Sequence, residues 1–260
     1  MNIIGVIPAR MAAKRLPNKP MELIHGIPMI GHVYQRSKLC QDFSEVYVAT
    51  CDSEIMDYIN KIGGKTILTA ESHVGAIDRV AEAVDLIEKQ DDIIYDTVAL
   101  IQGDEPMVTP NMIACAISPL MMEPDIQITS LMSEITSDDI FEDQNEVKVV
   151  VDINNYAMYF SREPIPSKRK GAIGYPRLKL VGITVFRRDF LTEFNTMFQT
   201  PLEVVESIDL IRIIENGMKI KMVMTEQVTY SVDTSQELEK IKELMNDDYL
   251  IHKYQDICKL

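Results

Sequence analysis

Residues 3–20 read Ile-Ile-Gly-Val-Ile-Pro-Ala-Arg-Met-Ala-Ala-Lys-Arg-Leu-Pro-Asn-Lys-Pro, an apolar segment that runs directly into a basic loop. The apolar part, Ile3 to Ile7, has the composition of a parallel strand buried on both faces. In a chain whose formal net charge is −14, the loop carries four cations within ten residues: Arg10, Lys14, Arg15 and Lys19. Open α/β sheets bind ligands at the carboxyl end of such a strand. Arginine forks and lysine charges suit a polyphosphate, and the small Ala12 and Ala13 would let backbone N–H groups approach it.

Two familiar phosphate motifs are absent from this loop. It has neither the G-x-x-x-x-G-K-[ST] of a P-loop nor the G-x-G-x-x-G of a dinucleotide-binding fold. A solvated basic loop is the alternative to a phosphate site. The acidic balance of the whole chain argues against nonspecific binding to nucleic acid or to an anionic membrane. An anion site in this loop is therefore a local exception to the surrounding field, which makes its cations more informative.

Length and composition predict one large domain. A chain of 260 residues that is 46% hydrophobic can bury a sizeable core. We expect a single domain over residues 1–260, with a small extra sheet and an acceptor-side loop at about 120–190. There is no long uncharged apolar run, and the N-terminus lacks the layout of a signal peptide. The cysteines have no metal-type spacing and predict reduced thiols in a cytoplasmic protein: Cys40, Cys51, Cys115 and Cys258.

Strands and helices alternate along the first half of the chain. Helical spacing of apolar residues predicts helices over Met29–Leu39, Asp52–Ile62 and Ala76–Lys89. The helix Asp52–Ile62 is capped at its start by Asp52 or Ser53, and Gly63-Gly64 closes it. Nearly continuous apolar runs predict further strands over Val46–Cys51, Lys65–Thr69 and Thr97–Ile101. This alternation predicts an α/β fold with a doubly wound sheet.

The rhythm changes in the second half. Strands are expected over Ile126–Met132, Val147–Ile153 and Tyr156–Phe160, the last two joined by the turn Asn154-Asn155. A basic loop, Lys168-Arg169-Lys170-Gly171, follows and either closes over an anionic acceptor or is simply solvated. The remaining elements are expected to be the strand Leu178–Arg187, the helix Val204–Glu215, the strand Lys219–Met224 and the helix Thr234–Met245.

Two carboxylates are candidates for a metal site. Asp104 lies just past the strand Thr97–Ile101, at the same sheet edge as the basic loop. Mg²⁺ takes one or two carboxylates together with phosphate oxygens. Asp233 follows the strand-like Val228–Val232 and precedes a helix, so it can supply the second carboxylate. Either one alone is also typical of a helix cap or a turn. With the cationic loop, they indicate metal-assisted nucleotidyl transfer, in which positioning and charge neutralisation at phosphorus dominate.

A series of collinear motifs carries a family resemblance. They are Gly5–Pro20, Gln102–Pro106, Val147–Val150, Tyr159–Pro166, Pro201–Glu203 and Val232–Thr234. The first resembles the signature of the sugar cytidylyltransferases. The others resemble one branch of it, the CMP-Kdo synthetases (3-deoxy-manno-octulosonate cytidylyltransferases), and the likeness runs from residue 3 to about residue 245. The resemblance implies a Rossmann-like nucleotidyltransferase sheet with helices on both faces, and a small additional sheet that closes a homodimer.

The resemblance also implies roles for residues at matching positions. Arg10, Arg15 and Lys19 would bind the CTP phosphates, and Asp104 and Asp233 would bind Mg²⁺. Catalysis would rest on the three cations and Asp104. The nucleotide site would further include Ala9, His73, Gly75, Ala76 and Arg79. The acceptor side would comprise Gln102, Arg162, Leu180, Thr184, Glu206 and Asp209, with Arg162 pairing with the carboxylate of the sugar. The implied reaction is in-line attack of the anomeric hydroxyl on the α-phosphorus, with pyrophosphate leaving.

Departures from the family pattern fall in the two binding pockets. The stretch His73–Arg79 lacks the Ser and Thr hydroxyls of the family's His-x-Ser-Gly-Thr-Asp/Glu-Arg. Leu180 and Thr184 stand where the family has His and Tyr facing the sugar, and Asp209-Leu210 stands where it has Glu-Gln. A pocket that has lost groups that hydrogen-bond a hydroxyl should not bind the same sugar well.

These departures leave the acceptor open. We expect transfer of CMP from CTP to an acidic sugar, either Kdo or a modified ulosonic acid (deoxy, amino or acylated), because the apolar replacements suit a less hydroxylated ligand. The same chemistry on a phosphonate or another small acid is an alternative. A homologue that binds the nucleotide without turnover is another, although such a protein has no need of both Asp104 and Asp233.

Overall fold

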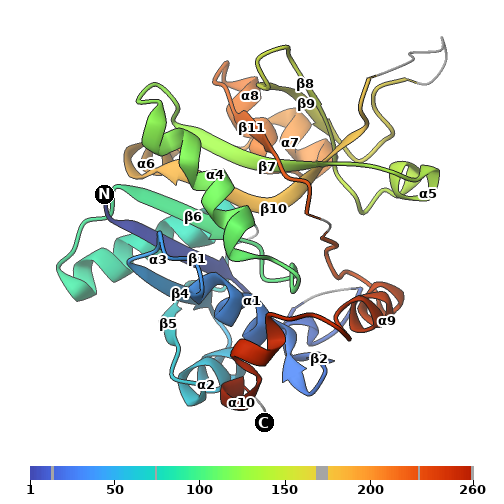
Figure 1. Ribbon diagram of the computed structural model, residues 1–260. Helices are drawn as coiled ribbons and strands as arrows, with labels where there is room; N and C mark the ends of the chain where they lie inside the picture. The colour runs from blue at the N-terminus through green and yellow to red at the C-terminus, as the bar shows by residue number, and fades with distance from the viewer. Residues whose placement is uncertain (13–14, 74, 168–174, 228, 259–260) are drawn as a thin grey trace. The chain divides into compact units, whose positions relative to one another are not determined.

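The computed structural model describes residues 1–12, 15–73, 75–167, 175–227 and 229–258 (Figure 1). Lys14, Val74 and the basic loop 168–171 therefore lie outside the described residues. The chain divides into two compact units. Unit 1 comprises Met1–Ala114 and Thr229–Leu260, and unit 2 comprises Cys115–Val228. No helix in the described ranges is both long and apolar enough to cross a bilayer.

Unit 1 contains the parallel sheet that the sequence predicts. Its strand order is β6-β1-β4-β5, formed by β6 (Thr97–Ile101), β1 (Ile3–Pro8), β4 (Glu45–Thr50) and β5 (Lys65–Leu68). All neighbouring pairs are parallel, and Val6 lies between Tyr47 and Leu100 in the register. Every residue of β1 and of β6 is buried, as expected of strands covered on both faces. The α/β fold predicted from the alternating pattern is confirmed.

Helices flank this sheet (Figure 1). The crossovers β1–α1–β4 and β4–α2–β5 run one way along the strand order, and β5–α3–β6 runs back. Because such crossovers are right-handed, α3 (Ala76–Asp91) lies on the face opposite to α1 (Met29–Lys38) and α2 (Ser53–Lys61). Between β1 and α1 lie a short 3₁₀ helix, η1 (Lys19–Met21), and the antiparallel pair β2 (Leu23–Ile24) and β3 (Ile27–Pro28). The last elements of the unit are α9 (Ser235–Leu244), η2 (Ile251–Lys253) and α10 (Gln255–Cys258).

Unit 2 is built on antiparallel pairing. β7 (Ile128–Glu134) pairs antiparallel with β10 (Leu178–Arg187) and parallel with β11 (Lys221–Met224). β8 (Lys148–Val151) and β9 (Ala157–Ser161) form the predicted hairpin, and β8 also pairs with β10. The unit also contains α5 (Asp138–Glu142) and α6 (Arg188–Thr196), and α4 (Pro110–Met122) begins in unit 1 and continues into unit 2.

Two secondary-structure predictions are wrong. The helix expected over Val204–Glu215 is two helices, α7 (Pro201–Glu206) and α8 (Leu210–Glu215). Ser207 ends α7 in the left-handed conformation, with a φ of +55°. The break leaves Glu206 at the carboxyl end of α7. The segment expected to be strand-like before Asp233 is irregular over residues 229–232.

A buried polar network ties α1 to the C-terminal part of unit 1. Arg36 donates through Nε to the Tyr254 hydroxyl (2.9 Å) and pairs with Asp248 (2.6 Å). His32 Nε2 lies 2.9 Å from the carbonyl oxygen of Ile24, which can only accept. Nε2 therefore carries the proton, and Nδ1 accepts from the Tyr254 hydroxyl at 2.9 Å. His32 and Arg36 are both fully buried, so neutral His32 is part of the folded core.

His32 should make stability depend on pH. Burial lowers the pKa of His32 to about 4, and the charge of Arg36 adds to that effect. The unfolded chain then binds the proton at a higher pH than the folded chain, so stability present above about pH 6.5 is lost as the pH falls toward 4. The free energy of unfolding should fall by roughly 3 kcal/mol between pH 6.5 and 4 because of His32, and His32→Gln should remove this part of the pH dependence. Urea unfolding at pH 7, 5.5 and 4.5 measures it, with exposed His252→Gln as the control. Equal pH slopes for His32→Gln and the wild type would contradict the expectation.

Candidate active site

The basic loop is anchored at both ends within unit 1. Where β1 ends, the N–H of Ala9 donates to the carbonyl of Ala49 (3.0 Å), and the N–H of Met11 donates to the Asp52 carboxylate (2.8 Å). Asp52 occupies the N-cap position of α2, but its side chain makes no capping bond within the described chain. It holds the loop instead. At the other end, Lys19 opens η1 after Asn18, which has a left-handed φ of 57°.

The loop after β6 approaches β1 closely. A Cβ atom at Gly103 would lie 2.8 Å from the carbonyl oxygen of Pro8, so only glycine fits without a backbone shift. The next residue, Asp104, accepts a hydrogen bond at its carbonyl oxygen from the N–H of Val232 (3.0 Å). This bond brings the segment that carries Asp233 to the end of β6. Asp104 and Asp233 therefore lie close together beyond the end of β6 in unit 1.

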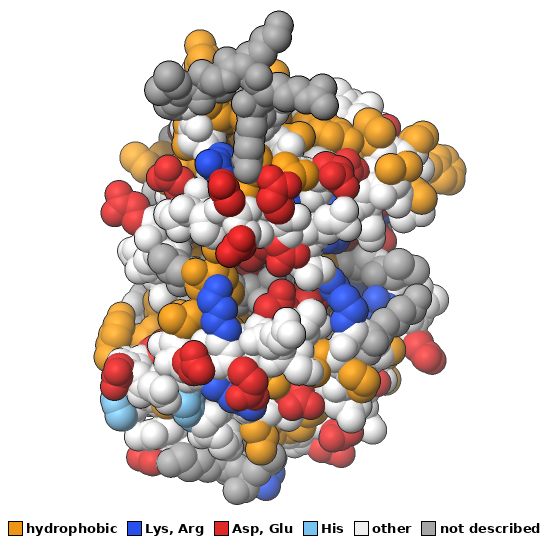
Figure 2. Space-filling view, turned by 90° about the vertical axis from the view of Figure 1, so that its right-hand side faces the viewer, with side chains coloured by type: hydrophobic (Ala, Val, Ile, Leu, Met, Phe, Trp, Pro, Cys, Tyr) orange, Lys and Arg blue, Asp and Glu red, His pale blue; other side chains and the backbone are white. Residues whose placement is uncertain are grey.

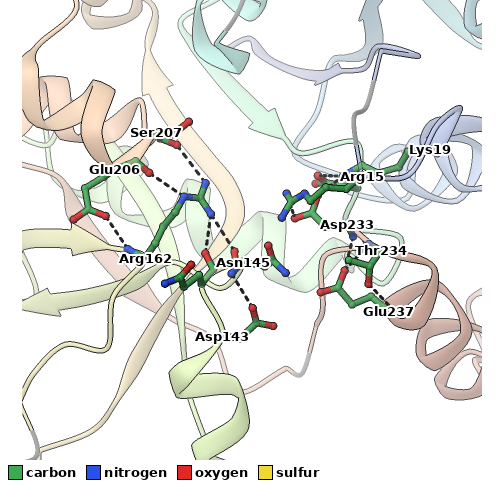
Figure 3. A network of polar contacts seen from close by, with 12 residues as sticks. Arg15, Lys19, Asp143, Asn145, Arg162, Glu206, Ser207, Asp233, Thr234 and Glu237 are labelled. Atoms are coloured by element: carbon green, nitrogen blue, oxygen red, sulfur yellow. Dashed lines mark hydrogen bonds and ion pairs between the residues drawn. The ribbon is translucent and has the colours of Figure 1, made fainter.

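Asp233 is held by the first turn of α9. The Glu237 carboxylate accepts from the N–H groups of Asp233 (2.7 Å) and Thr234 (2.8 Å) (Figure 3). The N–H of Glu237 donates back to the Thr234 hydroxyl at 3.3 Å, which completes a capping box. A capping box fixes the entry of the chain into a helix, so the Asp233 side chain is presented from a rigid backbone.

Four charged side chains meet there, and we call them the Lys19 cluster: Arg15, Lys19, Asp104 and Asp233. Lys19 Nζ lies 2.7 Å from Asp104 and 2.8 Å from Asp233, and Arg15 lies 2.8 Å from the second oxygen of Asp233 (Figure 3). The Lys19 side chain is only 14% exposed. Burial opposes its charged form, but the two carboxylates more than offset this, so the pKa of Lys19 is raised. Lys19 therefore remains a cation at any physiological pH.

The donor set of the cluster fits Mg²⁺. Asp104 and Asp233 each direct one oxygen at the same Lys19 Nζ atom, so the two carboxylates converge on one point. Carboxylate oxygens are the hard ligands that Mg²⁺ takes, together with phosphate oxygens and water. Within the described parts of the chain, no group of three or more His, Cys, Asp or Glu side chains is arranged to hold a metal.

The residues predicted to lie near the nucleotide base gather around the start of α3. His73 Nε2 lies 2.7 Å from the Glu82 carboxylate, which also accepts from the N–H of Ala70 (2.8 Å). Arg10 reaches the carbonyl of His73 at 3.4 Å. Gly75 is the N-cap residue of α3 and Ala76 its first residue. Glu82, which the sequence analysis did not single out, thus fixes the loop that carries His73.

Arg79 is buried behind this loop. One terminal nitrogen donates to the Thr69 hydroxyl (2.5 Å) and to the carbonyl of Ala70 (3.2 Å). The other, Nη2, is buried without a hydrogen-bond partner among the residues that the structure describes. A buried donor without a partner costs about 1–3 kcal/mol. An acceptor on a bound ligand would relieve that cost.

In unit 2, Arg162 and Glu206 belong to one polar network (Figure 3). The Glu206 carboxylate accepts from the backbone N–H of Arg162 (2.9 Å) and the hydroxyls of Ser161 (2.8 Å) and Tyr159 (3.2 Å). Burial opposes its ionisation, but these bonds offset it and lower the pKa of Glu206. The break between α7 and α8 ends α7 at the point where the Glu206 side chain reaches β9.

The Arg162 guanidinium donates to backbone carbonyl oxygens. Nε bonds Glu206 (2.9 Å), Nη2 bonds Ser207 (3.3 Å), and Nη1 bonds Gln144 (3.1 Å) and Asn145 (3.5 Å) (Figure 3). A guanidinium has five N–H groups. One N–H of Nη2 thus has no bond to a residue in the described ranges.

The other acceptor-side residues have separate surroundings. The hydroxyl of Thr184, on β10, lies 2.9 Å from that of Ser130, on β7. Leu180 is half-buried on β10, and Asp209 is the N-cap residue of α8. Gln102 is half-buried in unit 1, directly after β6. Within unit 2, the structure therefore joins Arg162 to Glu206 but leaves Thr184 in a pair of its own.

Gly103 offers a test of the site's backbone. We expect Gly103→Ala to lower kcat at least tenfold, because the contact with Pro8 would displace Asp104 by a few tenths of an ångström or more. Gly64→Ala is the matched control, since its Cβ would lie 2.9 Å from the carbonyl of Ile59, away from the Lys19 cluster. Both variants should lose thermal stability, and only Gly103→Ala should lose turnover. Wild-type kcat for Gly103→Ala would show that Asp104 does not depend on this approach.

Comparison with known proteins identifies the family to which the chain belongs. A family model described as cytidylyltransferase matches residues 4–220. The chain belongs to the cytidylyltransferase family. Its assignment to the CTP-dependent nucleotidyltransferases from the sequence is thereby confirmed.

Named relatives of this cytidylyltransferase agree over nearly its full length. The 3-deoxy-manno-octulosonate cytidylyltransferase of Fusobacterium nucleatum is 39% identical over 242 residues, covering 93% of this chain and 96% of the relative. That of Geobacter sulfurreducens is 40% identical over 253 residues, covering 94% and 99%. A solved structure, CMP:2-keto-3-deoxy-manno-octonic acid synthetase complexed with CTP, has a TM-score of 0.84 at 35% identity and covers 94% of this chain and 98% of that one. The resemblance to the CMP-Kdo synthetases is confirmed.

Proposed function

We propose that this cytidylyltransferase transfers CMP from CTP to an acidic sugar, Kdo or a modified 3-deoxy-ulosonic acid, and releases pyrophosphate. The Lys19 cluster carries the proposal, because it gathers two cations and two carboxylates at the end of β1 and β6. Cations suit the phosphates of CTP, and the carboxylates suit the Mg²⁺ that accompanies them. The names of the relatives and the CTP in the similar solved structure support the choice of nucleotide and of acceptor class.

Each charged residue of the cluster has a role in this chemistry. Asp104 and Asp233 would hold Mg²⁺, which when bound supplies charge stabilisation at the phosphates. Lys19 and Arg15 would turn to the phosphate oxygens and neutralise the charge that develops as pyrophosphate leaves. Because its pKa is raised, Lys19 acts as a fixed cation and not as a base. Arg10, next to the loop of His73, would bind a further phosphate.

Arg79 supports a specific contact with the nucleotide. Its buried Nη2 group has no partner within the described chain, and Nη1 of the same guanidinium donates to the carbonyl of Ala70, shortly before His73. A pyrimidine carbonyl oxygen is an acceptor that would satisfy this donor. The backbone of Ala9, Gly75 and Ala76 would complete the nucleotide site without the Ser and Thr hydroxyls that this chain lacks.

Arg162 supports an anionic acceptor. Its guanidinium is held by neutral carbonyl oxygens, as far as the described residues show, so its charge is not consumed by a direct ion pair. A fixed guanidinium with an N–H group to spare fits the carboxylate of an ulosonic acid. Such a cation is unusual in a chain whose formal net charge is −14. On the face seen in Figure 2, acidic side chains are spread widely and basic ones are fewer, in keeping with 40 acidic and 26 basic residues.

The residues of unit 2 at the acceptor-side positions suit a less hydroxylated acceptor. The Thr184 hydroxyl is already bonded to Ser130, Leu180 is apolar, and Leu210 is buried in α8. None of these groups replaces the hydroxyl contacts that the family's His, Tyr and Gln would make. We therefore propose a deoxy, amino or acylated ulosonic acid as an acceptor beside Kdo itself. On the family resemblance we also propose a homodimer, and on the spacing of the cysteines a cytoplasmic location.

The test is pyrophosphate release with Mg²⁺, each of the four NTPs, and a panel of acceptors. The panel contains Kdo, amino- and acylamino-ulosonic acids and phosphonates. We expect turnover with CTP and an ulosonic acid. Turnover with Kdo at full rate would refute the argument for a changed pocket, and turnover with a phosphonate alone would establish the alternative acceptor. Binding of CTP without metal dependence, together with no pyrophosphate release from any acceptor, would instead indicate a nucleotide-binding homologue.

A further inference from the structure

The motif Val147–Val150, most of which lies in β8, has no role in the proposed chemistry. Its lysine, Lys148, is fully buried. The residues just before it, 143–146, form a turn between α5 and β8, and we call them the 143–146 turn. All four carbonyl oxygens of this turn accept a hydrogen bond from a cationic side chain, either Lys148 or Arg162.

Lys148 uses all three of its N–H groups on backbone. Its ammonium donates to the carbonyls of Asp143 (2.7 Å) and Glu146 (2.6 Å), and to the carbonyl of Arg162. Burial lowers the pKa of Lys148, although Asp143 and Glu146 oppose that effect. A buried ammonium bonded only to neutral carbonyls is a costly way to fill a core position, which an apolar side chain fills more cheaply.

The ammonium of Lys148 instead fixes the position of Arg162. Lys148 holds the carbonyl of Arg162, and Glu206 holds its N–H at 2.9 Å, so both backbone groups of Arg162 are fixed. The guanidinium then rests on the Gln144 and Asn145 carbonyls of the same turn that Lys148 closes. Lys179 adds a further tie, since it bonds both oxygens of the Glu146 carboxylate at 3.0 Å. Backbone and side chain of Arg162 are thus set by one small assembly.

We propose that Lys148 is a positioning residue for the acceptor: it fixes Arg162 by binding its carbonyl oxygen and by shaping the 143–146 turn that supports its guanidinium. The inference rests on the proposed function, in which Arg162 binds the acceptor's carboxylate. A displacement of about 1 Å in a positioned group can cost roughly 100-fold in rate. Lys148 therefore influences acceptor binding through Arg162 and not by direct contact.

A second cation in unit 2 provides a matched control. Arg187 donates to the carbonyls of Leu120 (2.8 Å), Ile126 (2.8 Å) and Glu123 (3.2 Å), and so closes the turn after α4 in the same manner. Its bonds do not involve Arg162 or the 143–146 turn. Loss of either cation frees three carbonyls, so Lys148→Met and Arg187→Met should reduce thermal stability alike.

Steady-state kinetics separate positioning from a structural role. With the acceptor that the wild type uses best, we expect Lys148→Met to raise KM for the acceptor about 10- to 100-fold while KM for CTP stays within about twofold. Lys148→Gln, which keeps donors, should show a smaller rise and serves if Lys148→Met does not fold. Arg187→Met should leave both constants unchanged. Equal changes in the two KM values, or an effect of Arg187→Met as large as that of Lys148→Met, would overturn the inference.

Hydrogen exchange tests the same claim without any substrate. In the ligand-free protein, the amides of Asn145 and Arg162 donate to Asp143 and Glu206. We expect both to exchange faster in Lys148→Met than in the wild type, and to be unchanged in Arg187→Met. If the wild type turns over no acceptor in the panel, the proposed function fails while this measurement still stands. Unchanged exchange at both amides in Lys148→Met would refute the positioning role whatever the substrate.

Discussion

Lys19→Met should lower kcat/KM for CTP by about 100- to 1,000-fold and, in the same protein, tighten metal binding in the absence of nucleotide. Removing a positioned charge from a site of phosphoryl chemistry costs on the order of 3–4 kcal/mol of transition-state stabilisation. The gain in metal affinity has a separate cause. Lys19 Nζ lies 2.7 Å and 2.8 Å from the two carboxylates that would hold the metal, so the ammonium competes for the same oxygens.

The change in the charge of the cluster explains the tighter metal binding, which can be measured directly. The Lys19 cluster contains two cations and two anions and has no net formal charge, and Lys19→Met leaves it with −1. Titration with Mn²⁺ followed by electron paramagnetic resonance gives the affinity of the nucleotide-free protein, and Mg²⁺ should raise the Tm of the variant more than that of the wild type. Lys65→Met is the control, because Lys65 pairs with Glu45 at the exposed edge of the sheet. Metal affinity equal to that of the wild type would show that the ammonium does not compete.

The parts of the site that could be predicted are those with a local signal in the chain. Continuous apolar runs identify β1 and β6 as buried parallel strands, and parallel strands present their carboxyl ends at one edge. Asp104 and the basic loop had therefore to meet, and they do. Glu237 also had a readable signal, since Thr234-x-x-Glu237 is a capping box ahead of a helix.

Contacts between distant segments gave no such signal. Nothing local to Glu82 indicates that it holds His73, and nothing local to Asp52 indicates that it abandons its helix cap for the N–H of Met11. The break between α7 and α8 was missed for a similar reason. The sequence around Ser207 suits a continuous helix, and the contact of Glu206 with β9 accompanies the interruption. Tertiary contacts outweighed helix propensity there.

Asp104→Asn and Asp233→Asn should each lower kcat by about 100- to 1,000-fold, because losing a carboxylate ligand forfeits several kcal/mol of charge stabilisation supplied through the metal. The Mg²⁺ concentration for half-maximal turnover should rise in both. Asp52→Asn is the matched control, since Asp52 is a carboxylate of unit 1 that contacts the basic loop but is bonded to the N–H of Met11. It should change turnover only a few-fold and leave the Mg²⁺ requirement as it is.

The same two variants should bind CTP more tightly than the wild type when no metal is present. Each changes the formal charge of the Lys19 cluster from zero to +1, and one charge near a phosphate at the protein surface is worth about 1 kcal/mol, or roughly fivefold in Kd. Asp233→Asn should have the larger effect, because Asp233 pairs with both Arg15 and Lys19, whereas the one ion pair that the described residues show for Asp104 is with Lys19. Calorimetric titration of CTP in EDTA measures this. Tighter nucleotide binding together with far slower turnover would mean that the carboxylates bind the metal and also pair with the cations. Weaker binding in both variants would mean that the carboxylates hold Arg15 and Lys19 in the conformation that CTP needs.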